Sequence, residues 1–370
     1  MRLPGFVNAH SHAFQRRLRG TVERVDPAHP HDDFWTWREA MYAEAGRLDP
    51  DSAFEVALLA YREMRAAGYV AVGEFHYPHH RPDGTPYETP NAMAIAVAEA
   101  AVAAGLRIVL LPAAYHRNGW DGADRPPQPG QRRFCDPDVA TFLRRVDDLR
   151  AWAADRDGVT VGLAAHSVRA VPASWLEAIG AHAREHGLVL HVHAHEQRRE
   201  LAECDAEHGC TPIELLARCG FLGERTSVVH GIHVTDGDID ILARTGSIIV
   251  SCPTTEGNLG DGFLPVLRYR DAGVRLAIGS DSQVRVDPFE EVRELETGAR
   301  REGQTRHALL AATGDLWGEL VANGCAALGL TDAGTVAVDL DHPDLRGVAE
   351  ADLPYALATC ASAGVVARAA

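Results

Sequence analysis

Two histidines separated by one residue, His10 and His12, follow a short apolar segment near the start of the sequence. In an extended strand, residues two apart point to the same side, so both imidazoles can bind one cation. A single histidine pair with this spacing is common by chance and is a weak metal motif. It becomes a strong one when the same chain places further histidines and acids at the ends of other apolar segments.

Such residues do recur where predicted strands end: at His166, within residues 191–196, at His230 and at Asp281. In a parallel barrel the carboxyl ends of all strands lie on one face, so residues far apart in the sequence converge there. We therefore predict a metal site with four ligands: His10, His12, His193 and Asp281.

The histidine in the middle of the chain has competitors. His191, His193 and His195 share one parity, so all three would lie on the same side of a strand. We expect His193 to be the ligand, because the spacing His-x-x-Glu then places Glu196 beside the metal site once the strand has ended. His191 would lie deeper in the interior and His195 in a loop behind the ligands, although either could replace His193.

Three neutral imidazoles and one carboxylate are typical of Zn²⁺, and Fe²⁺ is compatible with them. An open position would remain for water, whose pKa the metal lowers toward about 7. All 36 basic residues are arginines, and the chain has no lysine. A carboxylated lysine bridging two metals cannot form, so we expect one metal ion; a bridging glutamate is the remaining route to two.

The elements that must position these residues alternate between short apolar segments and longer ones rich in Ala, Leu, Glu and Arg, as in βα units around a parallel sheet. Strands are predicted at residues 3–8, 70–75, 107–112, 160–165, 188–192, 227–229, 247–251 and 275–279. Helices are predicted at residues 52–67, 91–104, 138–154 and 173–186, and from 287 onward. We predict an α/β fold, a distorted (β/α)8 TIM barrel of the metal-dependent hydrolase type.

Two insertions interrupt the alternation: residues 31–41 are rich in aromatic side chains, and residues 115–137 in Pro and Gly. In a barrel such segments are usually βα loops over the active site. A disordered surface loop is the alternative for residues 118–130. We expect a catalytic barrel at residues 1–330 and a remnant of a C-terminal accessory segment at 331–370.

The composition limits the partners. A formal charge of −16 argues against nucleic acid or an anionic membrane as a partner. Seven cysteines without a C-x-x-C pair fit reduced thiols. The sequence has neither a signal-peptide pattern nor an apolar segment of about 18 residues. We expect a cytoplasmic homodimer that acts on a small molecule.

Several longer motifs resemble those of the formimidoylglutamate deiminases of the amidohydrolase superfamily. They occur in the same order, at residues 10–16 (HSHAFQR), 34–39 (FWTWRE), 73–77 (GEFHY), 131–134 (QRRF), 165–169 (AHSVR), 252–262 (CPTTEGNLGDG) and 279–282 (GSDS). The first and last are widespread in the superfamily, whereas FWTWRE and CPTTEGNLGDG are much more specific. Family members also carry a β-sandwich, which is built from the segments before and after the barrel in the sequence. His10 comes early and the last 40 residues lack a strand-rich pattern, so we expect a truncated or missing accessory β-sandwich unless the true start lies upstream.

The resemblance implies hydrolysis of the formimino group of N-formimino-L-glutamate to N-formyl-L-glutamate and ammonia, in histidine degradation. It implies catalytic roles for Glu196, His230 and Asp281. It also implies five substrate-binding residues: Gln15, Arg38, Tyr77, His166 and Arg169. Two arginines suit a small acidic amidine, because guanidinium groups bind carboxylates in pairs of hydrogen bonds.

Plainer interpretations remain. Arg38 could form a surface ion pair with Glu39 or Glu44, and His166 could be an interior histidine. Another mononuclear deaminase, acting on guanine, another purine or a pterin, is the first alternative. A non-catalytic metal-binding paralogue is the second.

Overall fold

A computed structural model describes residues 1–24 and 32–367. Residue 31, the first of the aromatic insertion predicted at 31–41, lies outside the described residues. The main sheet is a barrel of parallel strands in the order β2-β3-β4-β6-β7-β8-β9-β10, with β5 paired to β4. The strands are β2 (Phe6–Ser11), β3 (Tyr69–His76), β4 (Arg107–Ala114), β5 (Val159–Val161), β6 (Leu163–Ser167), β7 (Leu190–Ala194), β8 (Thr226–His230), β9 (Ile248–Ser251) and β10 (Arg275–Ile278). The predicted (β/α)8 barrel is confirmed, and each predicted strand overlaps an observed one.

One predicted strand, at residues 160–165, is divided at Gly162 into β5 and β6. A Cβ atom at Gly162 would lie 2.6 Å from Val189 Cγ2 and 2.8 Å from the Val189 carbonyl oxygen. The chain can therefore pass this close to Val189, the residue before β7, only with glycine at position 162. Both halves hydrogen-bond to β4, and β6 continues along β7.

The barrel closes where β2 meets the chain just after β10. Backbone amides of Ser280 and Asp281 each donate to the carbonyl of His10 over 3.0 Å, and the His12 amide donates to the Asp281 carbonyl over 3.0 Å. Gly279 permits this approach, because a Cβ there would lie 2.6 Å from the His10 carbonyl oxygen. Three of the four predicted metal ligands therefore sit on the closing seam.

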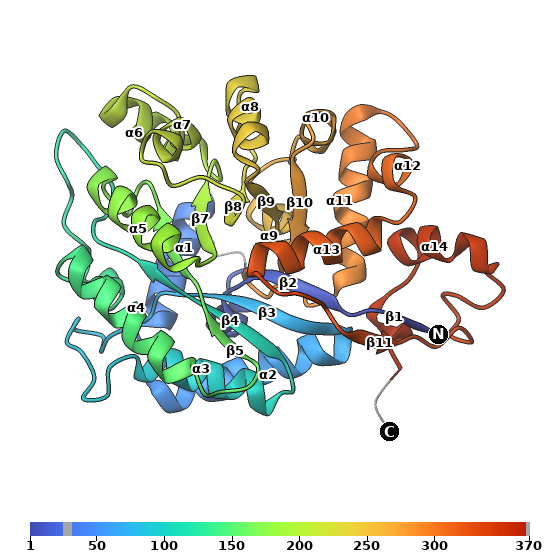
Figure 1. Ribbon diagram of the computed structural model, residues 1–370, viewed down its shortest axis with the longest axis horizontal. Coiled ribbons are helices and arrows are strands. Elements are labelled where there is room, and N and C mark those ends of the chain that lie inside the picture. The colour runs from blue at the N-terminus through green and yellow to red at the C-terminus, as the bar shows by residue number, and fades with distance from the viewer. Residues whose placement is uncertain (25–31, 368–370) are drawn as a thin grey trace.

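Helices surround the barrel (Figure 1). They are α1 (Phe34–Ala45), α2 (Pro50–Ala67), α3 (Ala92–Ala103), α4 (Val139–Ala153), α5 (Ala173–His186), α6 (Arg198–His208), α7 (Pro212–Arg218), α8 (Asp236–Thr245), α9 (Pro253–Leu259), α10 (Val266–Asp271), α11 (Pro288–Gly303), α12 (Leu309–Thr313), α13 (Leu316–Leu328) and α14 (Leu353–Thr359). Short 3-10 helices lie at Ala13–Leu18, Pro129–Phe134, Glu350–Asp352 and Ala363–Val365. Capping explains the sharp ends of α2, since Asp49 accepts from the amide of Ser52, and Gly68 adopts a left-handed conformation at the C-terminal end.

The barrel strands are largely buried. Every residue of β7, β8 and β9 is buried, as expected for strands covered on both faces. Helix α13 packs against β2 and β10. Asn323 on this helix donates to the carbonyl of Leu276 over 2.8 Å, and Trp317 donates to that of Pro4 over 3.0 Å.

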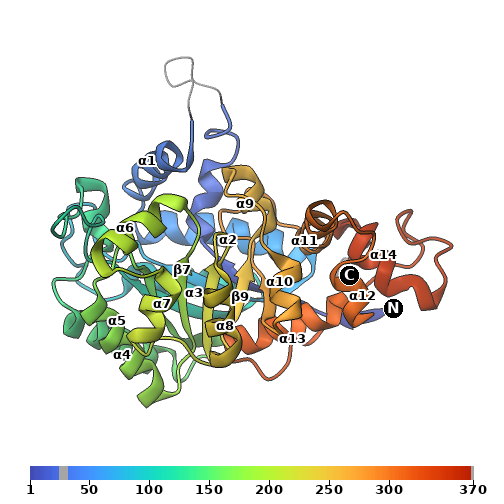
Figure 2. The same ribbon diagram turned by 90° about the horizontal axis from the view of Figure 1, so that it is seen from above.

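Outside the barrel, β1 (Arg2–Pro4) pairs antiparallel with β11 (Thr335–Ala337), so the first and last parts of the described chain lie side by side (Figure 1). Helix α14 packs against α11 and α13. At the opposite, carboxyl-end face of the barrel, α1 and α9 lie together toward the top of Figure 2. Within the described part of the chain, no helix is both long and apolar enough to cross a membrane.

Candidate metal centre and active site

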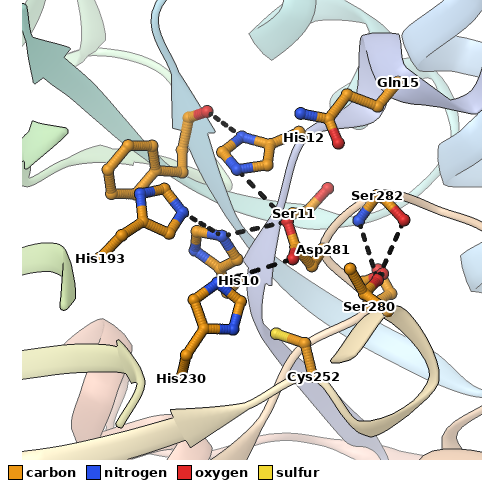
Figure 3. A network of polar contacts seen from close by, with 12 residues as sticks. His10, Ser11, His12, Gln15, His193, His230, Cys252, Ser280, Asp281 and Ser282 are labelled. Atoms are coloured by element: carbon orange, nitrogen blue, oxygen red, sulfur yellow. Dashed lines mark hydrogen bonds and ion pairs between the residues drawn. The ribbon is translucent and has the colours of Figure 1, made fainter. Parts of the chain in front are cut away.

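The four predicted metal ligands meet at the carboxyl ends of the barrel strands (Figure 3). One ligand atom from each lies within 4.8 Å of all the others, and all four residues are buried. His10 Nε2 lies 3.5 Å and His12 Nε2 3.3 Å from Asp281 Oδ1. His193 Nε2 lies 3.1 Å from His10 Nε2. β2, β7 and the turn after β10 thus bring together residues from both ends of the barrel sequence.

Hydrogen bonds behind the cluster orient two of the imidazoles. Nδ1 of His12 lies 2.8 Å from the carbonyl oxygen of Phe75, and Nδ1 of His193 lies 2.8 Å from that of His166. A carbonyl can only accept, so each Nδ1 carries the proton and each Nε2 directs a lone pair into the cluster.

The charges of the cluster fit a divalent cation. Burial lowers the pKa of His10 to about 3 and also lowers the pKa of His12 and His193, so the rings stay neutral. Burial would raise the pKa of Asp281, but the neighbouring His10 and His12 hold it below its ordinary value. Three neutral nitrogens and one carboxylate form a donor set suited to a single divalent metal.

A second group of acids lies beside the cluster and can handle protons. His230 Nε2 lies 3.5 Å from Glu196 Oε1 and 3.9 Å from Asp281 Oδ2. Burial alone would lower the pKa of His230, but Glu196, Glu256 and Asp281 raise it to about 10. Burial raises the pKa of Glu196 above its ordinary value, although His230 and Arg169 oppose the shift. A proton is therefore shared within this buried group, next to the metal position.

Glu256 is a contributor that the sequence analysis missed. Its Oε1 lies 3.3 Å from His230 Nδ1, and it also accepts from the Ser251 hydroxyl over 2.9 Å and the Cys252 amide over 2.8 Å. Glu256 holds the far side of the His230 ring, so Nε2 faces the cavity. The available signal was its place inside the specific segment 252–262. This segment begins directly after the strand predicted at 247–251, and Glu256 is its fifth residue.

His230 and Asp281 adopt backbone conformations that residues other than glycine rarely adopt. His230 has φ of 73° and Asp281 has φ of 47°, both in the left-handed region. Each stands where the chain leaves its strand, and the turn directs the side chain inward. Such conformations cost free energy and are concentrated at functional sites.

The predicted catalytic and substrate-binding residues line one small cavity. Its wall is formed by His12, Gln15, Phe34, Trp37, Arg38, Met41, Tyr77, His166, Arg169, His193, Glu196, His230, Leu259 and Asp281. His10 lies beneath the cavity floor, fully buried. Helix α1, from the aromatic insertion, supplies Phe34, Trp37, Arg38 and Met41 as a roof, which is the position predicted for that insertion.

Polar atoms without protein partners face this region. Gln15 donates from Nε2 to the Tyr77 hydroxyl over 2.9 Å, while its Oε1 has no hydrogen-bond partner among the described residues. The same holds for the buried Nε atoms of Arg38, a partly exposed residue, and of Arg169, a buried one. Buried groups of this kind are usually hydrogen-bonded, so a polar ligand in the cavity would complete the site.

The plainer interpretations of the arginine and the histidine can now be examined. Glu44 forms ion pairs with Arg17 over 2.6 Å and Arg47 over 3.2 Å, whereas the Arg38 guanidinium lies 4.6 Å from the centre of the Trp35 ring. Nδ1 of His166 lies 3.1 Å from the Ser167 hydroxyl, and the ring lines the cavity rather than the core. Both residues are thus placed at the site.

The competing histidines of the middle segment point elsewhere. Nε2 of His191 lies 3.0 Å from the carbonyl of Ala327 on α13. His195 lies 2.9 Å from the carbonyl of His233 through Nδ1, and its Nε2 accepts from the amide of Ile213 over 3.2 Å. Of the three, His193 alone belongs to the cluster in the described structure.

A second cavity adjoins the first and shares Arg38 and Arg169 with it. Its wall includes three further arginines from separate segments, Arg117, Arg125 and Arg199. Ion pairs neutralise part of this charge, since Glu203 binds Arg125 over 3.1 Å and Arg199 over 2.8 Å. Arg117 is likewise paired, with Asp124 and with Glu207 over 2.7 Å, so each of these three arginines has an acidic partner.

A parallel barrel with a histidine and aspartate cluster at its carboxyl-end face is the arrangement of a metal-dependent hydrolase. Residues 1–339 match the model of the Amidohydrolase family, and the chain belongs to this family. It is similar to the formimidoylglutamate deiminase of Pseudomonas aeruginosa, with 40% identity over 83% of this chain and 66% of the relative. The chain thus spans just under two thirds of that relative's length.

Two further similarities extend over nearly the whole chain. A 5-methylthioadenosine/S-adenosylhomocysteine deaminase of Halobacterium salinarum is 31% identical over 94% of this chain and 74% of the relative. The crystal structure of an amidohydrolase from Brucella melitensis superposes with a TM-score of 0.89 at 34% identity, covering 99% of this chain and 84% of that one. The predicted resemblance to formimidoylglutamate deiminases is confirmed at the level of sequence similarity.

Proposed function

We propose that the protein hydrolyses N-formimino-L-glutamate to N-formyl-L-glutamate and ammonia, with one divalent metal held by His10, His12, His193 and Asp281. The observation that carries this proposal is the cavity itself. It combines the His/Asp cluster and the Glu196–His230 pair with two arginines in its walls, the buried Arg169 and the partly exposed Arg38. The similarity to formimidoylglutamate deiminase supports the choice of substrate.

Zn²⁺ is the proposed metal, because three imidazoles and a carboxylate match its preferred ligands. When bound, such an ion acidifies a water molecule and polarises the bond under attack. The chain has no lysine to bridge a second metal, which favours a mononuclear site.

The reaction replaces the imino nitrogen of R–NH–CH=NH by the oxygen of water and releases ammonia. The water oxygen must lose both of its protons, and the leaving nitrogen must gain two. Asp281, whose Oδ2 lies 3.9 Å from His230 Nε2, can take up a proton from water. His230, which its acidic neighbours keep protonated, can donate a hydrogen bond to the same oxygen. Glu196, whose pKa burial raises, can deliver a proton to the nitrogen. Glu196 Oε1 and His230 Nε2 lie 3.5 Å apart, so the two protons lost by the water oxygen can pass through this group to the nitrogen.

The substrate carries two carboxylates, and the cavity offers fixed donors for them. Nη2 of Arg169 lies 3.4 Å from Glu196 Oε2. Its Nε lies 3.8 Å from Glu200 Oε1, beyond hydrogen-bond distance, so Nε can still donate to a substrate carboxylate. Arg38, Tyr77, Gln15 and His166 complete the proposed binding set.

The rival reaction is deamination of a purine, which the similarity to 5-methylthioadenosine/S-adenosylhomocysteine deaminase favours. Phe34 and Trp37 line the cavity and could stack on a heterocycle. The Nε atoms of Arg38 and Arg169 are buried and lack hydrogen-bond partners among the described residues, which is costly unless a ligand accepts from them. An acidic amidine therefore fits the cavity better than a neutral base.

The decisive experiment measures ammonia release by purified, metal-analysed protein. We expect turnover of N-formimino-L-glutamate and none of guanine, adenosine or a pterin. Robust purine deamination without activity on the amidine would overturn the proposal. A bound metal with no turnover of any amidine or base would instead indicate a non-catalytic paralogue.

Substrate charge provides a second test. Replacing Arg169 or Arg38 by lysine keeps the charge but removes paired hydrogen bonding. We expect KM for N-formimino-L-glutamate to rise about 10- to 100-fold, the loss expected for one or two hydrogen bonds to charged groups. N-formiminoglycine has one carboxylate, so its KM should rise less than that of N-formimino-L-glutamate in one of the two variants. The arginine replaced in that variant is the one that binds the distal carboxylate. Equal effects on both substrates in both variants would argue against direct binding.

The proposed catalytic unit is the segment 1–330. Every proposed site residue lies within it, from His10 in β2 to Asp281 in the turn after β10. Residues 331–370 would be an accessory segment that pairs with the start of the chain through β1 and β11.

A further inference from the structure

A second group of side chains that can act as metal ligands lies on two helices outside the barrel strands. His182 and His186 are one helical turn apart on α5, and Asp147 lies on the neighbouring helix α4. One ligand atom from each lies within 4.8 Å of the other two. Helices α4 and α5 pack side by side on the wall of the barrel (Figure 1). We call these three residues the α4–α5 histidine cluster.

The spacing of the two histidines suits a metal. Residues four apart on a helix lie on one face, and histidine pairs with this spacing bind Zn²⁺ in helical metal sites. The His182 and His186 ring centres are 4.4 Å apart. His182 is the more buried of the two, whereas His186, the last residue of α5, is exposed and free to change rotamer.

The aspartate supplies the third ligand from the other helix. His182 Nε2 lies 3.2 Å from Asp147 Oδ1. Two atoms bound to one tetrahedral Zn²⁺ at about 2.0–2.2 Å lie roughly 3.3–3.5 Å apart, so this pair already has the required separation. Arg150 donates to the same oxygen over 2.8 Å. Its half-exposed side chain would have to give way or share the carboxylate.

We propose that the α4–α5 histidine cluster is a second, non-catalytic binding site for Zn²⁺ or a similar borderline divalent ion. Two imidazoles and one carboxylate leave a fourth position to water, as in an exposed three-ligand site. The ion replaces the proton on His182 Nε2 and joins α4 to α5. Binding to the folded chain alone stabilises it by linkage. This site is independent of the proposed amidine hydrolysis.

The test counts metal. Protein already carrying its first equivalent is titrated with ZnCl₂ in the micromolar range and analysed for bound zinc after gel filtration. Wild type is expected to bind a second equivalent and to gain thermal stability with it. His186→Ala and Asp147→Asn should lose the second equivalent and the stability gain, while turnover stays at the wild-type level.

The matched control is His307→Ala, which removes another exposed histidine and should keep the second equivalent. Because His186 is exposed, its replacement leaves the packing of α5 intact. The proposal is overturned if wild type binds a single equivalent, or if His186→Ala and Asp147→Asn bind zinc as wild type does. In either case the 3.2 Å contact is only a hydrogen bond between helices.

Discussion

The Nε2 atoms of His10 and His193 lie 3.1 Å apart, although the residues are separated by 183 positions in the sequence. His193 carries its proton on Nδ1, where it meets the carbonyl of His166. Its Nε2 is therefore a bare acceptor that faces another ring nitrogen in a buried environment. The same Nε2 atom also lies within 4.8 Å of ligand atoms of His12 and Asp281, and this convergence of four ligands is the reason to regard the cluster as a metal centre.

Single replacements should show that His193, and not the nearby His195, binds the metal. We expect His193→Ala to lose the bound metal and with it the activity, because one of three nitrogen ligands is gone. His195→Gln should keep the metal, since His195 contacts backbone groups of Ile213 and His233 instead. The measurement is metal content by elemental analysis after dialysis. Full metal content in His193→Ala would show that the cluster has been assigned to the wrong histidine.

Glu256 should matter for turnover more than for binding. It holds Nδ1 of His230 at 3.3 Å, and loss of such an outer partner typically costs about 10- to 100-fold. We expect Glu256→Gln to lower kcat by this factor with little change in KM or metal content. The double variant with His230→Ala should be no slower than His230→Ala alone, because Glu256 acts through His230. Additive losses would indicate a separate role.

The seam between β2 and β10 should be intolerant of a single methyl group. A Cβ at Gly279 would lie 2.6 Å from the His10 carbonyl oxygen and 3.0 Å from Cys252 Sγ. We expect Gly279→Ala to lower the free energy of unfolding by about 1–3 kcal/mol, as overpacking does, and to weaken metal binding by shifting His10. Gly223→Ala is the control, because its Cβ would meet no atom within 4 Å. Urea unfolding and metal titration of both variants check this, and equal behaviour would contradict it.

A buried ion pair beside the Pro-rich loop should make stability depend on pH. Asp136 Oδ2 lies 2.7 Å from Arg145, and Oδ1 lies 3.2 Å from His80. Burial would raise the pKa of Asp136, but His80 and Arg145 hold it below the ordinary 3.8. The folded-state pKa is thus depressed, so the stabilisation is complete above about pH 5 and is lost as the pH falls through and below the ordinary carboxyl value.

Replacing Asp136 by asparagine should remove that dependence. We expect Asp136→Asn to cost about 3–5 kcal/mol at neutral pH, because Arg145 is left buried without its partner. The difference from wild type should shrink toward pH 3. Asp148→Asn, which removes an exposed carboxylate from α4, the helix that carries Arg145, should change little. The check is chemical unfolding at a series of pH values, and a difference that stays constant down to pH 3 would exclude the assigned role.

The sequence alone was sufficient for the barrel, because each strand is a short apolar run between helix signals and both patterns are local. It also indicated which strand ends carry chemistry, since polar residues directly after buried strands of a parallel barrel must share one face. His10 and His12 could be paired from strand geometry alone. The absence of lysine likewise needed no structure to argue against a bridged pair of metals.

Tertiary structure decided what depends on contacts between distant segments. Parity could not separate His193 from His191 and His195, because all three point the same way until the strand ends and the chain turns. Glu256 could not be assigned a role, because its partner His230 lies on a neighbouring strand. The closing seam at Gly279 and the Asp147–His182 contact between helices arise from packing between elements, which no local pattern in the sequence records.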